Sequence, residues 1–337
     1  ACNARLEARC EATCEARCNA GCGGIRPDVA RAVIVAVTGA SGFVGGAIVR
    51  ALLARGHEVH TYGQREAAAL RAPLPNYIAW NLTHGRRTVP RADVVVHCAA
   101  LVGDWGDETW YHAANVTGTQ VVLESFPSAR VVYVSTSSVY SDHLPPGPIA
   151  ESASTGDCRY SPYGRTKAQA ERLVLARDGG VVLRPHLVYG PGDTTLLPRV
   201  LEARRLGMLP VPGAGTNTLS VTHIDNFVQA VLSACDRRGV SGAFNIADAE
   251  VARRDELLRV VLARAGVNPR LLHIPQAVAW TTATVMERLW PTRVPPRGPR
   301  LTRYVIHQLT SDHVLDISRA RAELDYQPLH TFRSTSG

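Results

Sequence analysis

Lysine is almost missing from this 337-residue chain: of its 37 Lys and Arg residues, all but Lys167 are arginine. The arginines are scattered, and no basic run is interleaved with aromatic residues, so the net charge of +8 does not indicate nucleic-acid binding. Apolar runs stay well below the ~18 residues needed to cross a bilayer, and we identify no secretory leader pattern. We therefore expect no membrane span and no nucleic-acid partner, and we predict a cytoplasmic protein.

Metal-ligand spacing is also missing. Zinc sites usually combine one Cys-x2-Cys pair with a second pair or with histidines, and neither this pattern nor a metal spacing among the 12 histidines occurs here. Five cysteines instead crowd the start of the chain, most of them four residues apart: Cys2, Cys10, Cys14, Cys18 and Cys22. We predict no metal site, and we interpret residues 1–30 as a low-complexity, Cys-rich, disordered extension.

The rest of the chain alternates between two kinds of segment. Short apolar runs rich in β-branched residues are separated by helical stretches, which predicts a parallel sheet covered by helices on both faces. The fold class is therefore α/β, a Rossmann-type doubly wound parallel sheet with a smaller, mostly helical C-terminal substrate lobe. Strands are expected at 32–37, 58–62, 77–80, 94–97, 131–135 and 181–184, and helices near 109–125 and 161–177. The sheet domain would comprise 31–189 plus about 219–248, and the lobe 190–218 and 249–337.

A glycine-rich turn follows the first expected strand, with the spacing Gly39-x2-Gly42-x2-Gly45. Glycines let the backbone approach a phosphate, and the N-terminus of the following helix supplies N–H donors and positive potential. The turn therefore predicts a dinucleotide site that includes Ser41, Phe43 and Val44; the alternative is a purely structural turn.

The end of the second strand bears on the cofactor. An acidic residue there would bind the adenosine ribose and favour NAD, but the chain has Gly63-Gln64-Arg65. A guanidinium suits a 2′-phosphate, so we favour NADP and keep NAD as possible; Arg65 pointing into solvent is the alternative. Asn81 and Leu82, after the third strand, are placed to meet the adenine.

Tyr163 and Lys167 are four residues apart and share one face of an expected helix. An ammonium beside a phenol lowers the pKa of that phenol, which would make Tyr163 a general acid/base. The alternative is a chance pair among ten tyrosines.

With these residues in view, the chain resembles the extended short-chain dehydrogenase/reductase superfamily, of the NAD-dependent epimerase/dehydratase type, over about 32–330. Within it, the chain is most similar to the 3β-hydroxysteroid and sterol dehydrogenase branch, because of the segment 101–106 before the helix of Asn115. The matching motifs are Thr38-Gly39-Ala40-Ser41-Gly42-Phe43-Val44-Gly45, His97-Cys98-Ala99-Ala100, Asn115-Val116-Thr117-Gly118-Thr119, Tyr163-x3-Lys167 and Arg184-Pro185-His186-Leu187-Val188-Tyr189-Gly190-Pro191-Gly192.

The resemblance implies roles for individual residues. Tyr163 would exchange a proton with the substrate oxygen, Lys167 would contact the nicotinamide ribose, and Thr136 would donate a hydrogen bond to the reacting carbonyl, with Ser135 and Ser137 as neighbouring alternatives. Asn115 would order water behind the lysine, unless it is only a helix cap. Further residues are implied to line the cofactor (Ala99, Ala100, Pro185, His186, Val188) or the substrate (Val102, Asp104, Trp105, Ser137, Tyr140).

Three functions remain open. The first is an NAD(P)-dependent oxidoreductase that interconverts a secondary alcohol and a ketone on a bulky apolar substrate. The second is a nucleotide-sugar 4-epimerase with tightly bound NAD; dehydration is disfavoured because Ser137-Ser138 replaces the Asp-Glu of the dehydratases. The third is a non-catalytic dinucleotide sensor. The resemblance also implies a homodimer through the helices at 109–125 and 161–177.

Overall fold

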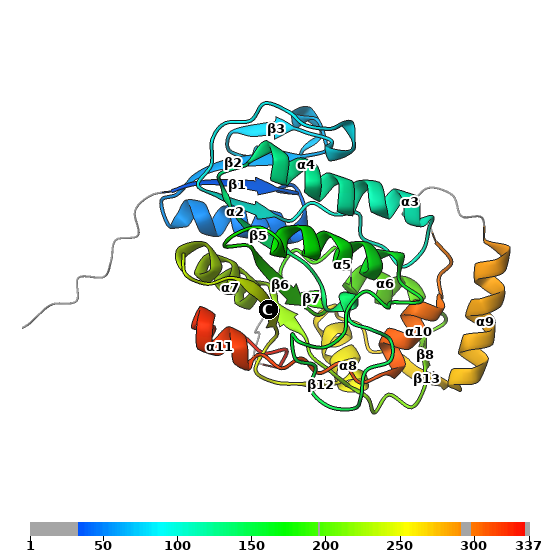
Figure 1. Ribbon diagram of the computed structural model, residues 1–337. Coiled ribbons are helices and arrows are strands. Elements are labelled where there is room, and N and C mark those ends of the chain that lie inside the picture. The colour runs from blue at the N-terminus through cyan, green and yellow to red at the C-terminus, as the bar shows by residue number, and fades with distance from the viewer. Residues whose placement is uncertain (1–32, 195, 291–297, 334–337) are drawn as a thin grey trace, which may run out of the picture. The chain divides into compact units, whose positions relative to one another are not determined.

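A seven-stranded parallel sheet forms the centre of the computed structural model, which describes residues 33–194, 196–290 and 298–333 (Figure 1). The strand order is β3-β2-β1-β4-β5-β6-β11. The strands are β1 (Ile34–Thr38), β2 (Glu58–Gly63), β3 (Tyr77–Ala79), β4 (Val94–His97), β5 (Arg130–Val134), β6 (Val181–Pro185) and β11 (Gly242–Ile246). The predicted fold class is confirmed, whereas the extension predicted for residues 1–30 lies outside the described residues.

Alternate strand residues point to opposite faces of this sheet, and each face has its own hydrophobic core. On one face, Val94 and Val96 pack with helices α2 (Phe43–Ala54) and α7 (Ile224–Asp236). On the other, Val95 packs with helix α4 (Gly118–Ser125), and helix α5 (Pro162–Leu175) covers β5 and β6. Strands buried on both faces explain the nearly continuous Val-rich runs in the sequence.

The strand order reverses at β1. The chain runs outward from β1 through β2 to β3 and then returns to place β4 on the other side of β1. In open α/β sheets, ligands bind in the crevice that such a reversal leaves beyond the carboxyl ends of the strands. The glycine turn lies beyond the carboxyl end of β1, against that of β4, where such a crevice is expected.

The glycine turn fits tightly into this position. Gly39 has a φ of +67°, and a Cβ built on it would lie 2.7 Å from the backbone nitrogen of Ala99. Gly45 lies in the first turn of α2, where a Cβ would come within 2.3 Å of the Gly39 carbonyl oxygen. Gly42 begins the helix without a side-chain cap. The first N–H groups of α2 therefore remain available to an anion.

The second part of the fold is built from the segments on either side of α7. It contains helices α6 (Leu196–Ala203), α8 (Arg254–Arg264), α9 (Gln276–Leu289) and α10 (Arg303–Thr310) and three two-stranded sheets. Those sheets pair β7 (Val188–Tyr189) with β10 (Thr222–His223), β9 (Thr218–Leu219) with β12 (Ala252–Arg253), and β8 (Met208–Pro212) with β13 (Arg270–Ile274). Helix α11 (Ser318–Leu324) returns to pack beside α7.

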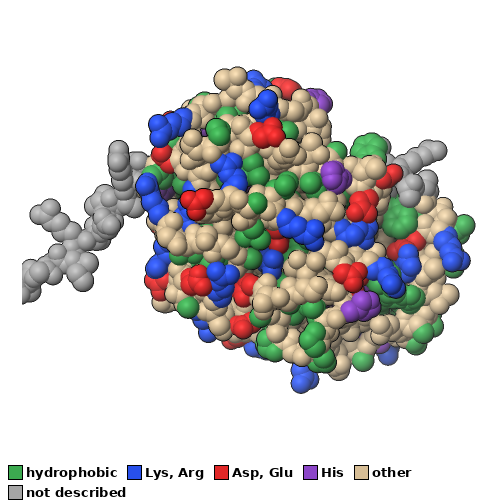
Figure 2. Space-filling view, viewed as in Figure 1, with side chains coloured by type: hydrophobic (Ala, Val, Ile, Leu, Met, Phe, Trp, Pro, Cys, Tyr) green, Lys and Arg blue, Asp and Glu red, His purple; other side chains and the backbone are tan. Residues whose placement is uncertain are grey.

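Helices α9 and α10 pack on each other through Ala279, Ala283 and Ile306. The outward side of α9 leaves Val278, Val285 and Leu289 exposed. On the face seen in Figure 2, basic and acidic side chains are interspersed. Among the described residues, no helix combines the length and the apolar character that crossing a bilayer requires.

One predicted helix differs in detail. The segment predicted as a helix at 109–125 consists of α3 (Glu108–Tyr111), a π-helical turn (His112–Thr117) and α4. Apolar periodicity does not reveal a single wide turn inside a longer helix, because the residues on both sides keep helical spacing. Such turns are rare and often occur at functional sites, and this one contains Asn115.

The glycine turn gives a direct test of the fold. Gly45→Ala should lower the free energy of unfolding by about 1–3 kcal/mol and weaken dinucleotide binding, because the added methyl meets the Gly39 backbone. Gly46→Ala is the matched control, since a Cβ there would lie 3.5 Å from its nearest neighbour and alanine favours a helix. Urea unfolding and dinucleotide titration measure both effects. Equal stability of the two variants would contradict the tight fit.

Candidate active site

The predicted catalytic residues converge beside the crevice. Tyr163 and Lys167 lie one turn apart on α5, and Thr136 follows β5. Asn115 approaches from the π-helical turn and donates a hydrogen bond to Thr166, which lies between the other two on α5. Thr136 and Tyr163 lie close enough for the Thr136 side chain to lower the pKa of the phenol. The structure thus brings together all four residues that the sequence singled out.

Successive side chains in the segment after β5 point in alternating directions. The Ser135 hydroxyl donates to buried Glu171, which also pairs with Arg184. The Ser137 hydroxyl lies 2.6 Å from Nδ1 of buried His186. Thr136 and Ser138 are partly exposed and point the other way, and the Thr136 hydroxyl donates to Ser138 Oγ at 3.1 Å. Of the three hydroxyls considered from the sequence, Thr136 is therefore the one next to Tyr163.

Lys167 is buried against the sheet. Its ammonium donates to the Val134 carbonyl oxygen at 2.6 Å and lies 3.9 Å from the centre of the Tyr133 ring. Burial lowers the pKa of Lys167 to about 7, although the negative charge of Glu171 opposes this shift. The single lysine thus rests where a carbonyl and an aromatic face partly replace water around its charge.

The electrostatics of Tyr163 differ from the expectation. Burial raises the pKa of Tyr163 above its ordinary value of 10, the nearby Tyr304 raises it further, and the hydrogen bond with Thr136 lowers it. The net shift is upward, opposite to the lowering that the spacing of Lys167 predicted. The phenol is consequently protonated at neutral pH, the state in which it can donate a proton.

Asn115 holds a backbone segment in place. Its amide oxygen accepts from the Leu101 N–H at 2.8 Å, and its amide nitrogen donates to the Leu101 carbonyl at 3.1 Å. This double contact fixes the start of the segment 101–106. Asn115 lies within the π-helical turn, so the alternative that it caps a helix end is wrong. Its predicted role toward water stays a prediction.

A buried chain of hydrogen bonds links this region to the glycine turn. The Thr119 hydroxyl donates to the Asn115 carbonyl and lies 3.0 Å from Nε2 of His97, whose Nδ1 is 2.6 Å from the Thr38 hydroxyl. Thr38 also accepts from the Ala99 N–H. Burial lowers the pKa of His97 to about 3, so its ring is neutral. Sequence reasoning saw His97 only as part of a motif and missed this link.

Most of the predicted cofactor residues follow the carboxyl ends of strands. At the end of β2, a Cβ atom built on Gly63 would lie 3.3 Å from Ser41 Oγ. A Cβ atom built on Gly192 would lie 3.6 Å from the Phe43 ring. Arg65 is exposed just beyond β2. Asn81 accepts from the Thr83 backbone, whereas Leu82 packs into the core under α4. Ala99 and Ala100 directly follow β4, Pro185 ends β6, His186 comes next and Val188 begins β7.

The five residues predicted to contact the substrate differ in what their side chains contact in the structure. The Tyr140 hydroxyl is buried between Asn245 and Arg184, and Ser137 faces His186, so neither hydroxyl faces Tyr163. Trp105 packs against Gly298, its carbonyl accepts from Tyr111, and Asp104 lies 3.6 Å from Arg199. Val102 is 57% exposed. These five positions stay predictions for substrate contact.

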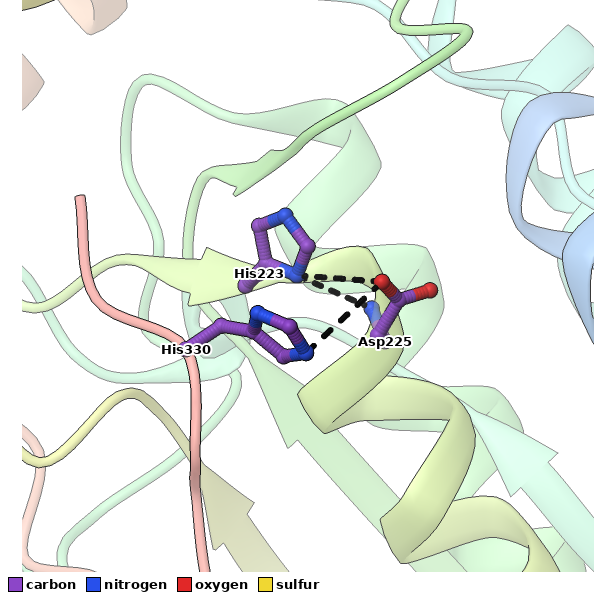
Figure 3. A group of neighbouring side chains, drawn as sticks. All are labelled: His223, Asp225 and His330. Atoms are coloured by element: carbon purple, nitrogen blue, oxygen red, sulfur yellow. Dashed lines mark hydrogen bonds and ion pairs between the residues drawn. The ribbon is translucent and has the colours of Figure 1, made fainter. Parts of the chain in front are cut away.

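Sequence reasoning also missed a group with possible metal ligands. His223 and Asp225 at the start of α7 and His330 near the C-terminal end have ligand atoms within 4.8 Å of one another (Figure 3). The two rings, however, are stacked 4.5 Å apart at an interplanar angle of 28°. In-plane lone pairs of such rings run side by side and do not converge on one ion. We therefore assign this group to holding the C-terminal segment against α7.

Comparison with known proteins agrees with this geometry. The model of the NAD dependent epimerase/dehydratase family matches residues 35–247. The chain is 34% identical to a 2-alkyl-3-oxoalkanoate reductase of Stenotrophomonas maltophilia, over 87% of this chain and 94% of the relative. It is 30% identical to a 3 beta-hydroxysteroid dehydrogenase/Delta 5-->4-isomerase of Mycobacterium tuberculosis, over 88% of this chain and 86% of the relative. The fold is similar to that of a UDP-glucuronic acid 4-epimerase of Bacillus cereus in complex with NAD (TM-score 0.67, 23% identity, covering 89% and 94%).

The buried ammonium predicts a pH dependence of stability. Because the pKa of Lys167 is about 7 in the folded chain and about 10.5 when unfolded, the unfolded state binds more protons between these values. This residue should therefore make stability rise with pH, by up to about 1.4 kcal/mol per unit. The difference in urea unfolding free energy between wild type and Lys167→Met, measured at pH 7.5 and 9, tests it. A difference that is independent of pH would show that the ammonium is not buried.

Proposed function

Since the chain belongs to the NAD dependent epimerase/dehydratase family, we propose that it is an NAD(P)-dependent oxidoreductase that interconverts a ketone and a secondary alcohol on a bulky, apolar substrate. The observation that carries the proposal is the Tyr163 phenol beside the Thr136 side chain and one helical turn from Lys167. A protonated phenol beside a second hydroxyl is suited to the reduction of a carbonyl.

The residues of the crevice fit a dinucleotide. The tight turn at Gly39 and Gly45 and the uncapped start of α2 form a cradle that leaves backbone N–H groups for a pyrophosphate. The reduced dinucleotide, when bound, supplies the hydride. Lys167, one helical turn from Tyr163, is the residue that would hold the nicotinamide ribose.

The protein residues carry the proton chemistry. Thr136 turns its single hydroxyl proton from Ser138 Oγ to the carbonyl oxygen, where negative charge develops as the ketone is reduced. Tyr163 donates its proton to the same oxygen, which completes the alcohol. In the oxidative direction the same two groups act in reverse, with Tyr163 accepting the proton. Asn115 keeps Leu101, and with it the segment 101–106, in position beside α5.

Support for an apolar substrate comes from the relatives and from the lobe. The two relatives are named for a 2-alkyl-3-oxoalkanoate and for a 3 beta-hydroxysteroid, both of which carry an oxygen on a largely hydrocarbon skeleton. In this chain, the ring of Tyr160, just before α5, packs against that of Trp280 on α9 at 5.1 Å, so aromatic groups lie where the lobe meets α5. The epimerase alternative rests on the structural neighbour, whose identity of 23% supports the fold alone.

For the cofactor we propose NADP as the preferred form. The end of β2 has no carboxylate to bind a ribose 2′-hydroxyl. A side chain at position 63 would also have little room, because a Cβ atom built on Gly63 would lie 2.8 Å from the Tyr77 hydroxyl. Tyr77 in turn donates to the Arg65 carbonyl, which fixes that backbone beside the crevice. The exposed guanidinium of Arg65 is the group that would bind a 2′-phosphate.

We further propose a homodimer and a cytoplasmic location. The two helices expected to form the dimer interface, α4 and α5, lie next to each other on one face of the sheet. Nearby, Trp110 on α3 and Leu175 at the end of α5 are 46% and 40% exposed.

Replacing the phenol tests the reaction. Tyr163→Phe should lower kcat at least a hundredfold and leave NADPH affinity within about twofold, since the proton donor is lost while the cradle remains. NADPH oxidation with long-chain 3-oxo esters, ketosteroids and UDP-sugars measures it, and NADPH fluorescence gives the affinity. Conversion of a UDP-sugar without net oxidation would favour an epimerase instead. Dinucleotide binding without turnover of any substrate would favour a sensor.

Arg65 tests the cofactor preference. Arg65→Gln should raise the KM for NADPH about tenfold and leave the KM for NADH unchanged, because only the 2′-phosphate interaction is lost. Arg71→Gln, at an exposed position in the following loop, is the control. If NADH is the better substrate of the wild type, the preference is for NAD.

A further inference from the structure

The reduction described above leaves Tyr163 without its proton, and that proton must be replaced before the next turnover. A water behind Lys167, ordered by Asn115, is one predicted source. In the structure, however, the lysine ammonium is directed to the sheet. The Asn115 side chain is bonded to Leu101 and Thr166. A second path to the phenol therefore deserves a search among the groups on its other side.

A line of hydroxyl groups provides such a path. The Thr136 side chain lies beside the Tyr163 phenol, and its hydroxyl donates to Ser138 Oγ at 3.1 Å. Ser138 Oγ lies 2.8 Å from the Tyr304 hydroxyl, and either of these two atoms can be the donor. We call Thr136, Ser138 and Tyr304 the hydroxyl line. It is held against α5, because a Cβ built on Gly164 would overlap the Ser138 carbonyl oxygen.

The hydroxyl line leads from the phenol toward the surface. Tyr304, in the first turn of α10, is partly exposed. Burial of its phenol raises the pKa of Tyr304 to about 12, and the nearby negative charge of Asp104 raises this pKa further. The Asp104 side chain is 17% exposed and lies 3.6 Å from the more exposed Arg199. The line therefore connects Tyr163 to the neighbourhood of a carboxylate that water reaches.

Hydroxyl groups that are bonded to one another can pass protons without becoming charged. Each accepts a proton on a lone pair while it donates its own. The mutual bonding of Ser138 and Tyr304 leaves no free group for a ligand, but it is what a continuous proton path requires. Burial raises the pKa of Tyr163 more than that of Tyr304. Transfer of a proton from Tyr304 to the Tyr163 phenolate is therefore not uphill.

We propose that the hydroxyl line is a proton relay that restores the proton of Tyr163 after each reduction. Once the alcohol has formed, the Tyr163 phenolate takes the proton of Thr136, which takes that of Ser138. Ser138 takes the proton of Tyr304, and Tyr304 takes one from water beside Asp104. Each O–H bond that breaks is replaced by a new one, so one proton from water enters for each ketone reduced. The inference rests on the proposed ketone reduction and adds the residues that sustain it.

Pre-steady-state kinetics distinguish a relay from a structural role. Ser138→Ala and Tyr304→Phe begin their first turnover with Tyr163 protonated, so the rate of the first NADPH oxidation should stay within about twofold of wild type. Later turnovers wait for a proton, so kcat should fall at least about tenfold, after a burst equal to the enzyme concentration. Ser138→Thr keeps a hydroxyl and should restore kcat. Ser141→Ala, at a partly exposed serine outside the line, is the control.

A second readout needs no turnover. In protein whose tyrosines carry an isotopic label at Cζ, the NMR shift in mixed light and heavy water reports exchange of each hydroxyl proton. The Tyr163 signal is the one that is missing from Tyr163→Phe. Ser138→Ala should slow exchange of the Tyr163 hydroxyl proton several-fold, because the path to water is broken. Ser141→Ala should leave this exchange unchanged.

Two results would overturn the relay. One is a first turnover that slows as much as kcat does, which would assign the hydroxyl line to holding Thr136 in place. The other is an unchanged kcat together with unchanged hydroxyl exchange, which would favour the path through Lys167 and Asn115. If wild type reduces no ketone at all, the proposed function fails. The exchange measurement then still decides whether the line carries protons to Tyr163.

Discussion

The close approach of the β1–α2 turn to the end of β4 is the contact on which the rest of the site depends. Because Gly39 has no side chain, its backbone lies directly against Ala99, and the ends of two strands from opposite halves of the sheet meet there. The same junction starts the buried hydrogen-bond chain from Thr38 through His97 to the turn that contains Asn115. Cofactor cradle and catalytic helix are thereby held by one piece of structure.

Burial then determines the chemistry of the site. The Tyr163 phenol is kept protonated by its surroundings, while the only lysine is turned to a carbonyl and a ring behind it. In this arrangement the phenol has Thr136 as its neighbour, and the Lys167 ammonium is directed to the sheet. An enzyme that reduces ketones needs this protonation state at the start of its reaction.

Much of the fold and part of the site could be predicted from the sequence. The strand and helix pattern, the glycine turn and the Tyr163–Lys167 pair depend on short-range spacing, and the structure places them as expected. The π-helical turn around Asn115 could not be predicted, since one wide turn leaves the apolar pattern around it unchanged. The pKa of Tyr163 was predicted with the wrong sign, because spacing reveals a neighbouring charge but not the loss of water around the phenol.

The sequence by itself determined the features for which a few neighbouring positions suffice: a strand–turn–helix with three glycines, and two candidate side chains one helical turn apart. Only the tertiary structure decided which hydroxyl among residues 135–138 faces Tyr163, because Glu171 and His186, from other elements, hold Ser135 and Ser137 away from it. It also brought Tyr304 to Ser138 across 166 residues. Side-chain direction in an irregular segment is set by the partners it packs against, and those lie far away in the sequence.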